Sequence, residues 1–140
     1  MNSNVLGILA LLHKSDDPWT IKSRVKIHCL ALHLQEQSDE APTYSFDGQV
    51  DGPRSNTVDN ALETAIERDL LVKKELPTFG GGTQERFTLT ADGAAVVEQR
   101  SDALIVQAAQ TVMNQYDYPV SNLVKDTVAE YPRFRAALRW

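Results

Sequence analysis

Three helical patterns lie directly before two strand patterns that flank a glycine-rich loop. The apolar spacing predicts the helices around residues 5–12, 19–35 and 56–70. The strand patterns cover residues 71–76 and 85–90, and the loop between them contains three consecutive glycines, which is typical of a β-hairpin. Three helices followed by a hairpin is the order of a winged helix-turn-helix core. The chain therefore predicts an α+β, mostly helical fold with such a core.

Local signals place the starts of several elements. Asp17 followed by Pro18 predicts an N-cap with proline in the first helical turn. Ser55 is a candidate N-cap for the helix before the hairpin. Residues 43–46 have the pattern of a short strand, and the glycines and aspartates after them predict turns.

Two further helical segments follow the hairpin. One long stretch runs from Ala91 to about Tyr116, and Ser121 caps a last helix that ends before Pro132. We predict a winged helix-turn-helix domain over residues 1–92 and a C-terminal helical extension over residues 93–140. The extension has an apolar face of its own, formed by Leu104, Ile105, Ala108, Ala109, Val112 and Tyr116. This face either forms a homodimer interface or folds back onto the core.

The composition of the 140 residues limits the choice of partners and compartment. A formal net charge of −5 and a pI near 5.1 argue against binding polyanions through bulk charge, though not through a local basic patch. Cys29 is the only cysteine, which suits a reducing cytoplasm, and neither a signal peptide nor a membrane span is expected. Six lysines against eight arginines resemble the usage of salt-loving archaea, in which an acidic excess serves solubility.

Four short motifs are spread over residues 5–132. They are the basic and then apolar run from Lys22 to Leu32, Gly52-Pro53-Arg54-Ser55 before a helix, Leu89-Thr90-Ala91-Asp92-Gly93 after the hairpin, and Tyr131-Pro132. Together they resemble the YwgA-like and Panacea-like group of winged helix-turn-helix proteins. The Gly-Leu pair that usually ends the third helix of that group is absent, because Asp69 precedes Leu70 here. The resemblance implies either a DNA-binding regulator or an antitoxin-like interaction protein.

Side chains that suit DNA lie at the start of the third helix and along the hairpin. In a winged helix-turn-helix domain this helix enters the major groove, and the hairpin reaches phosphates or the minor groove. Arginine can bind a guanine edge, asparagine an adenine edge, and hydroxyl groups suit phosphates. The candidate contacts to double-stranded DNA are Arg54, Ser55, Asn56, Thr57, Asn60, Lys73, Lys74, Gln84 and Arg86. Additional backbone contacts could come from Lys14, Lys22, Arg24 and Lys26.

An acidic stripe on the same helix opposes this interpretation. Asp59, Glu63 and Glu67 recur every four residues, and carboxylates are repelled by phosphates. DNA recognition would then be confined to the first turn. Alternatively, the stripe faces a basic protein partner, in an antitoxin-like or adaptor-like interaction module that does not bind DNA. The aromatic anchors of that module would be Tyr116, Tyr118, Phe134 and Trp140.

Other kinds of site receive little support. Cys29 and His33 have a spacing that can hold a metal ion, but no further ligands accompany them, and a buried thiol is the usual interpretation. The three glycines lead into a strand rather than a helix, so they do not form a phosphate-binding loop. No catalytic motif is present. We therefore expect no enzyme activity, no cofactor and no metal, and predict a sequence-specific transcriptional regulator.

Overall fold

The structure is a computed structural model that describes residues 2–37, 44–49 and 52–134. Its helices are α1 (Ser3–His13), α2 (Arg24–Gln37), α3 (Asn56–Glu67), α4 (Ala91–Glu98), α5 (Leu104–Tyr116) and α6 (Val120–Glu130), with the short 3-10 helix η1 (Pro132–Phe134). Together with two small sheets they confirm the predicted α+β, mostly helical fold. None of the helices in the described residues is long and apolar enough to cross a membrane.

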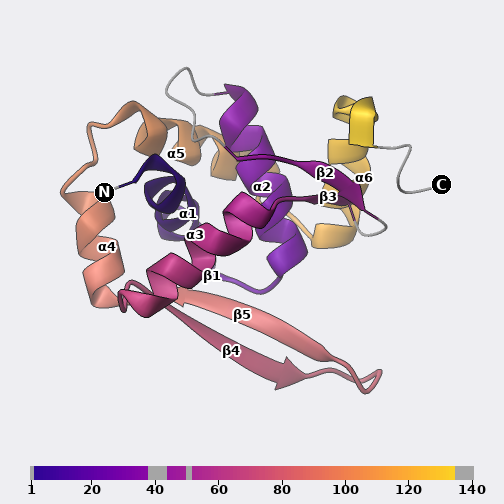
Figure 1. The fold of residues 1–140 in the computed structure, drawn as a ribbon, viewed down its shortest axis with the longest axis horizontal. Helices are drawn as coiled ribbons and strands as arrows, with labels where there is room; N and C mark the ends of the chain where they lie inside the picture. Colours follow the sequence, from indigo (N-terminus) through magenta and orange to yellow (C-terminus); the bar gives the residue numbers. More distant parts are fainter. Residues whose placement is uncertain (1, 38–43, 50–51, 135–140) are drawn as a thin grey trace.

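The strands form two antiparallel sheets. β1 (Thr20–Ile21), β4 (Leu71–Pro77) and β5 (Thr83–Leu89) make a three-stranded sheet in the order β1-β5-β4. β2 (Asp47–Gln49) and β3 (Gly52–Arg54) pair with each other, and β3 packs against α2 and α6. The β4–β5 hairpin projects away from the helices (Figure 1). The order from α1 to β5 thus places one helix, α3, directly before a long hairpin.

The register of the hairpin decides which side chains face the helices. Phe87 and Leu89 are buried in the core, and Lys73 lies opposite Phe87 in the ladder, so it shares their face. Lys74 and Arg86 are also opposite each other, one position further along each strand. Because side chains alternate along a strand, this second pair lies on the other face of the sheet.

Helix α1 lies at the centre of the hydrophobic core. Every residue from Val5 to Leu12 is buried, because α2, α3, α4, α5 and the sheet surround the helix. Asn2 caps its start by accepting a hydrogen bond from the Asn4 amide. An apolar helix of this kind needs cover on all sides, and the remaining elements supply it within one chain.

Most of the apolar face of the C-terminal helices is covered within the chain, although its first member, Leu104, is 51% exposed. α5 packs against α1 and α2, and its residues Ile105, Ala109 and Val112 are buried in the same core as α1. The structure thus shows these residues folded back onto the core, and the homodimer stays a prediction. Residues on both sides of the predicted boundary after residue 92 contribute to this core.

Several predicted boundaries were wrong. Asp17 and Pro18 do not begin a helix, because Thr20 and Ile21 pair with β5 and α2 starts only at Arg24. The predicted strand over residues 43–46 is displaced: residue 43 lies outside the described residues, and the observed strands are β2 and β3.

The C-terminal helices also begin and end differently from the prediction. The single helix expected over residues 91–116 is interrupted between α4 and α5. The last helix begins at Val120 after Pro119 and has no side-chain cap, so Ser121 does not serve as its N-cap. The interruption allows α4 and α5 to pack separately against α1.

The Leu-Thr-x-x-Gly motif forms a tight junction between the hairpin and α4. The Thr90 hydroxyl accepts a hydrogen bond from the Gly93 amide at 3.0 Å and donates one to the Asp69 carbonyl at 2.7 Å. Gly93 lies so close to Leu70 that an added Cβ would be 2.1 Å from the Leu70 carbonyl oxygen. Only glycine fits at this contact.

Substituting Gly93 tests this junction. We expect Gly93→Ala to lower the free energy of unfolding by about 2–3 kcal/mol, because one of two backbone segments must move. Urea denaturation monitored by circular dichroism measures the change. Gly80→Ala is the matched control, since its added Cβ has no atom within 4 Å; its stability should remain within about 0.5 kcal/mol of the wild type. Equal effects of the two substitutions would contradict the role of Gly93.

Candidate nucleic-acid interface

A groove of about 590 Å³ lies between the hairpin, the end of β3 and the start of α2. Its lining residues are Lys22, Ser23, Arg24, Val25, Arg54, Glu75, Thr78, Thr83, Gln84, Glu85 and Val120. They come from the segment before α2, the start of α2, β3, both hairpin strands with their loop, and the start of α6. In the predicted winged helix-turn-helix interpretation, this groove is the candidate position for the backbone of DNA.

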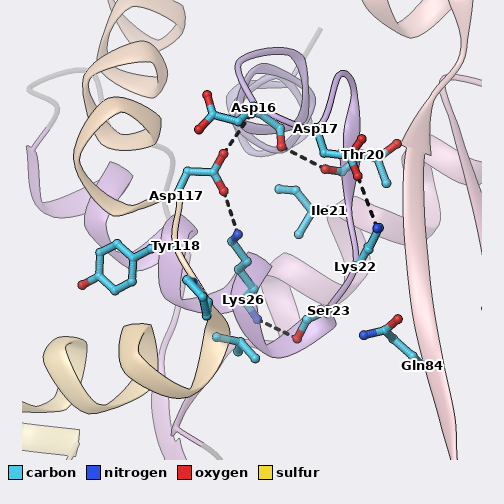
Figure 2. Close-up of a pocket in the computed structure, with 13 residues that line it drawn as sticks. Asp16, Asp17, Thr20, Ile21, Lys22, Ser23, Lys26, Gln84, Asp117 and Tyr118 are labelled. Atoms are coloured by element: carbon cyan, nitrogen blue, oxygen red, sulfur yellow. Dashed lines mark hydrogen bonds and ion pairs between the residues drawn. The ribbon is translucent and has the colours of Figure 1, made fainter. Parts of the chain in front are cut away.

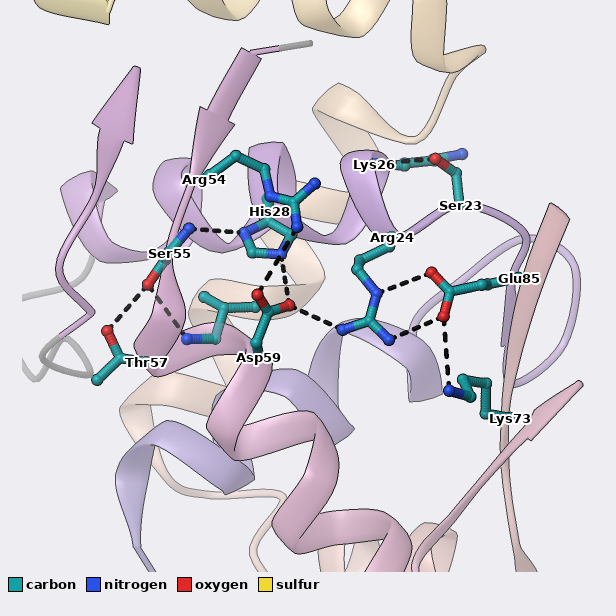
Figure 3. Close-up of polar contacts among 11 residues, drawn as sticks. Ser23, Arg24, Lys26, His28, Arg54, Ser55, Thr57, Asp59, Lys73 and Glu85 are labelled. Atoms are coloured by element: carbon teal, nitrogen blue, oxygen red, sulfur yellow. Dashed lines mark hydrogen bonds and ion pairs between the residues drawn. The ribbon is translucent and has the colours of Figure 1, made fainter. Parts of the chain in front are cut away.

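Arg24 connects the three elements around this groove (Figure 3). Its Nε and Nη2 each donate a hydrogen bond of 2.8 Å to a Glu85 oxygen on β5. Its Nη1 donates a third, also 2.8 Å long, to Oδ1 of Asp59 on α3. A paired guanidinium–carboxylate contact of this kind is directional as well as strong. Arg24 therefore fixes the start of α2 relative to α3 and the hairpin.

His28 completes the link between α2 and α3. Its ring is fully buried, and Nδ1 accepts a hydrogen bond of 2.9 Å from the Ser55 amide. Nε2 must then carry the hydrogen and donate to Asp59 Oδ1 at 3.0 Å. Burial lowers the pKa of His28 and outweighs the opposing effect of Asp59. The neutral ring thus orients the first turn of α3.

The two carboxyl groups of the network are held in the ionised form. The hydrogen bonds from Arg24 lower the pKa of Glu85. Burial alone would raise the pKa of Asp59, but hydrogen bonds from Arg24 and His28 lower it overall. The Arg54 guanidinium is a further 3.7 Å from Asp59. Because these cations offset its charge, Asp59 does not extend the acidic stripe, and the exposed part consists of Glu63 and Glu67.

The candidate residues at the start of α3 have two different roles. Ser55 is buried and accepts a hydrogen bond from the Val58 amide at 3.1 Å, which confirms it as the N-cap and engages the hydroxyl that was also a candidate DNA contact. The Thr57 hydroxyl accepts a hydrogen bond from the Ser45 amide at 2.7 Å. Asn56 and Asn60 are exposed. The side-chain amides of Asn56 and Asn60 are therefore the candidate polar groups of α3 that face solvent.

The candidate residues of the hairpin divide between its two faces. Lys73 lies on the helix side, with its Nζ 3.7 Å from Glu85. Gln84 lines the groove. Lys74 and Arg86 lie on the opposite face. The structure therefore places Gln84 with Arg54 in the groove and Lys73 beside Glu85, and it does not place all the predicted cations on one surface.

A second hollow, of about 390 Å³, lies between the segment before α2 and the α5–α6 loop (Figure 2). Lys26 Nζ is 2.6 Å from Asp117 Oδ1, and the other oxygen of Asp117 accepts from the Asp16 amide at 2.9 Å. Lys26 is thus used to hold the C-terminal helices against the core. Its predicted contact with a DNA backbone would require breaking this ion pair.

Two of the aromatic anchors proposed for a protein partner are buried. Tyr116 stacks on His33 with ring centroids 3.7 Å apart, and Phe134 is 5% exposed. The Tyr118 hydroxyl donates to Asp126 at 2.7 Å, and Trp140 lies outside the described residues. The described members of this set do not form an exposed aromatic patch, because Tyr116 and Phe134 help to cover α2 and the C-terminal helices.

The Cys29 and His33 pair has structural contacts instead of a third ligand. Cys29 is buried, and His33 Nε2 is 3.0 Å from the hydroxyl of Thr127 on α6. Within residues 2–37, 44–49 and 52–134, no group of three or more His, Cys, Asp and Glu side chains is arranged to hold a metal ion.

No protein-family model, curated protein or solved structure matches this chain. The resemblance to YwgA-like and Panacea-like proteins stays a prediction.

The lowered pKa values of Asp59 and Glu85 predict sensitivity to acid. Carboxyl groups of an unfolded chain titrate near about pH 4. The stabilisation from these two groups is therefore complete above that pH and is lost as the pH falls through their lower folded-state pKa values. Replacing Arg24 with methionine should cost about 2 kcal/mol at neutral pH and reduce the further loss in acid.

Urea unfolding between about pH 7 and about pH 3 measures both effects. Lys22→Met is the control, because it removes an exposed cation 3.6 Å from Asp17 and should change stability by less than about 0.5 kcal/mol. If Arg24→Met loses as much stability in acid as the wild type does, the network is not the source of the acid sensitivity.

Proposed function

We propose that this chain is a DNA-binding regulator of the winged helix-turn-helix type. The supporting observation is the element order α1, β1, α2, β2, β3, α3, β4, β5 with the sheet order β1-β5-β4, in which α3 directly precedes a projecting hairpin. In such domains the helix before the hairpin reads the major groove, and the hairpin contacts the adjacent backbone. The groove beside the hairpin, which is lined by Arg54 just before α3, is the position that we assign to that backbone.

The exposed amides of α3 supply the chemistry of base recognition. Asn56 and Asn60 are four residues apart, so they lie on one face of the helix at successive turns. An asparagine amide can bond both N6 and N7 of adenine. Arg54 precedes this turn and suits either a guanine edge or a phosphate.

The charge distribution limits how deeply α3 enters the groove. Asp59 is offset by Arg24, whereas Glu63 and Glu67 are exposed further along the helix. The first turn therefore approaches the bases, and the second half of α3 stays away from the phosphates. With few cations near the groove, we expect about three phosphate contacts for each bound chain, and a slope of about −3 in log affinity against log salt.

Fluorescence anisotropy with DNA from upstream of the gene, and with a scrambled duplex, tests the proposal. Asn60→Ala should weaken binding to the upstream duplex by about 1–3 kcal/mol, because an adenine contact is lost. Arg54→Ala should also weaken binding. Lys125→Ala is the control, since it removes an exposed cation of α6 that does not line the groove, and it should leave affinity unchanged.

Two results would overturn this assignment. One is a folded wild-type protein that binds neither duplex at low salt, where electrostatic attraction is strongest. The other is wild-type affinity in both Asn60→Ala and Arg54→Ala. In the first case the exposed Glu63 and Glu67 favour the alternative, a module that binds a basic protein partner.

A further inference from the structure

The outer face of the β4–β5 hairpin holds two cations in direct opposition. Lys74 and Arg86 are partners in the antiparallel register, so their side chains lie next to each other on that face. Like charges in such positions repel each other. The acidic residues of the two strands, Glu75 and Glu85, occupy the alternate positions and lie on the other face. The repulsion between the two cations therefore has no offset from the strands themselves.

A hollow of about 260 Å³ accompanies the two cations. It is lined by Thr20, Val72, Lys74, Arg86 and Thr88. The Nε atom of Arg86 is buried and has no hydrogen-bond partner within the described residues. A buried donor without an acceptor costs about 1–3 kcal/mol. A negatively charged acceptor in the hollow would suit both cations.

Two hydroxyl groups add further donor capacity. Thr20 Oγ1 and Thr88 Oγ1 are 3.2 Å apart and share one hydrogen bond. Each hydroxyl has one hydrogen, so the pair holds a second hydrogen that the shared bond does not use. The Thr20 hydroxyl oxygen is also 3.4 Å from the Pro18 carbonyl oxygen. This contact is long, so it competes only weakly for the second hydrogen. The hollow thus combines an ammonium, a guanidinium and a hydroxyl donor, with no carboxylate in its lining.

We propose that this hollow binds a phosphate group. Two positive charges match a phosphate dianion, and its several oxygens can accept from the Arg86 guanidinium, the Lys74 ammonium and a threonine hydroxyl at once. Val72, which is 45% exposed, offers an apolar edge to the organic part of a phosphomonoester. The site is on the opposite face of the sheet from the groove and does not rest on DNA binding.

Nuclear magnetic resonance of the ¹⁵N-labelled full chain tests the site. Inorganic phosphate and glycerol phosphate are the probes, added at constant ionic strength against sodium chloride. We expect saturable shifts of the Arg86 Nε–H and of the Lys74 and Thr88 amides, and none at the Asn60 amide. Tighter binding of glycerol phosphate would identify the ligand as a phosphomonoester, and equal or weaker binding would identify it as inorganic phosphate.

Matched lysine substitutions distinguish a specific phosphate site from general electrostatic attraction of phosphate to the hairpin. Lys74→Gln and Arg86→Gln should each weaken phosphate binding at least about tenfold, which corresponds to about 1.4 kcal/mol. Lys73→Gln is the control, because it removes the same charge one residue away on the opposite face. Absence of saturable shifts in the wild type, or equal weakening by Lys73→Gln, would overturn the proposal.

DNA binding is measured on the same variants to separate the two proposals. Lys74→Gln should keep wild-type affinity for DNA, and Asn60→Ala should keep wild-type affinity for phosphate. If Lys74→Gln weakens DNA binding as strongly as phosphate binding, the outer face contacts a nucleic-acid backbone, and a separate phosphate site is excluded.

Discussion

The position of the hairpin relative to the helices depends on one guanidinium group. Arg24 bonds to Glu85 on β5 and to Asp59 on α3 while it belongs to α2, and its guanidinium lies 5.2 Å from the centre of the Phe87 ring. Buried Leu71, Phe87 and Leu89 hold the base of the hairpin in the core, and β1 pairs with only two residues of β5. The ion pair with Glu85 acts further out along the hairpin, where no apolar core supports it.

The same network determines how an acidic chain can display positive charge. Alternation along β4 and β5 sends Glu75 and Glu85 to one face, where Arg24 and Lys73 meet Glu85, and leaves Lys74 and Arg86 on the other. The overall charge of −5 therefore says little about any single surface of the molecule. Local register, not composition, decides which cations are paired.

Local patterns predicted the elements that depend on neighbouring residues. The start of α3 after its cap Ser55, the helix α1 and the two hairpin strands all follow from short-range spacing and were confirmed. The end of α3 also has a local explanation. Asp69 adopts a positive φ of 59°, and the Leu70 amide bonds to the Ala65 carbonyl, which is the geometry for which glycine is usual. Aspartate tolerates this conformation at some cost.

The failures arose where distant residues decide the outcome. Nothing near Thr20 shows that it will pair with Thr88, so the start of α2 was placed too early. His28 and Asp59 are also too far apart for a pattern to connect them. By contrast, the separation of Lys73 from Lys74 could have been predicted, because adjacent residues of a strand always point to opposite faces.

This alternation restricts how the hairpin can change in evolution. Its tip contacts little, since an added Cβ at Gly80 or Gly81 has no atom within 4 Å. Within the ladder, however, one residue added to each strand would turn every side chain between the insertion and the tip to the opposite face of the sheet. Acidic and basic side chains would then exchange faces. Homologues of this chain should therefore lengthen or shorten the paired part of the hairpin in steps of two residues per strand.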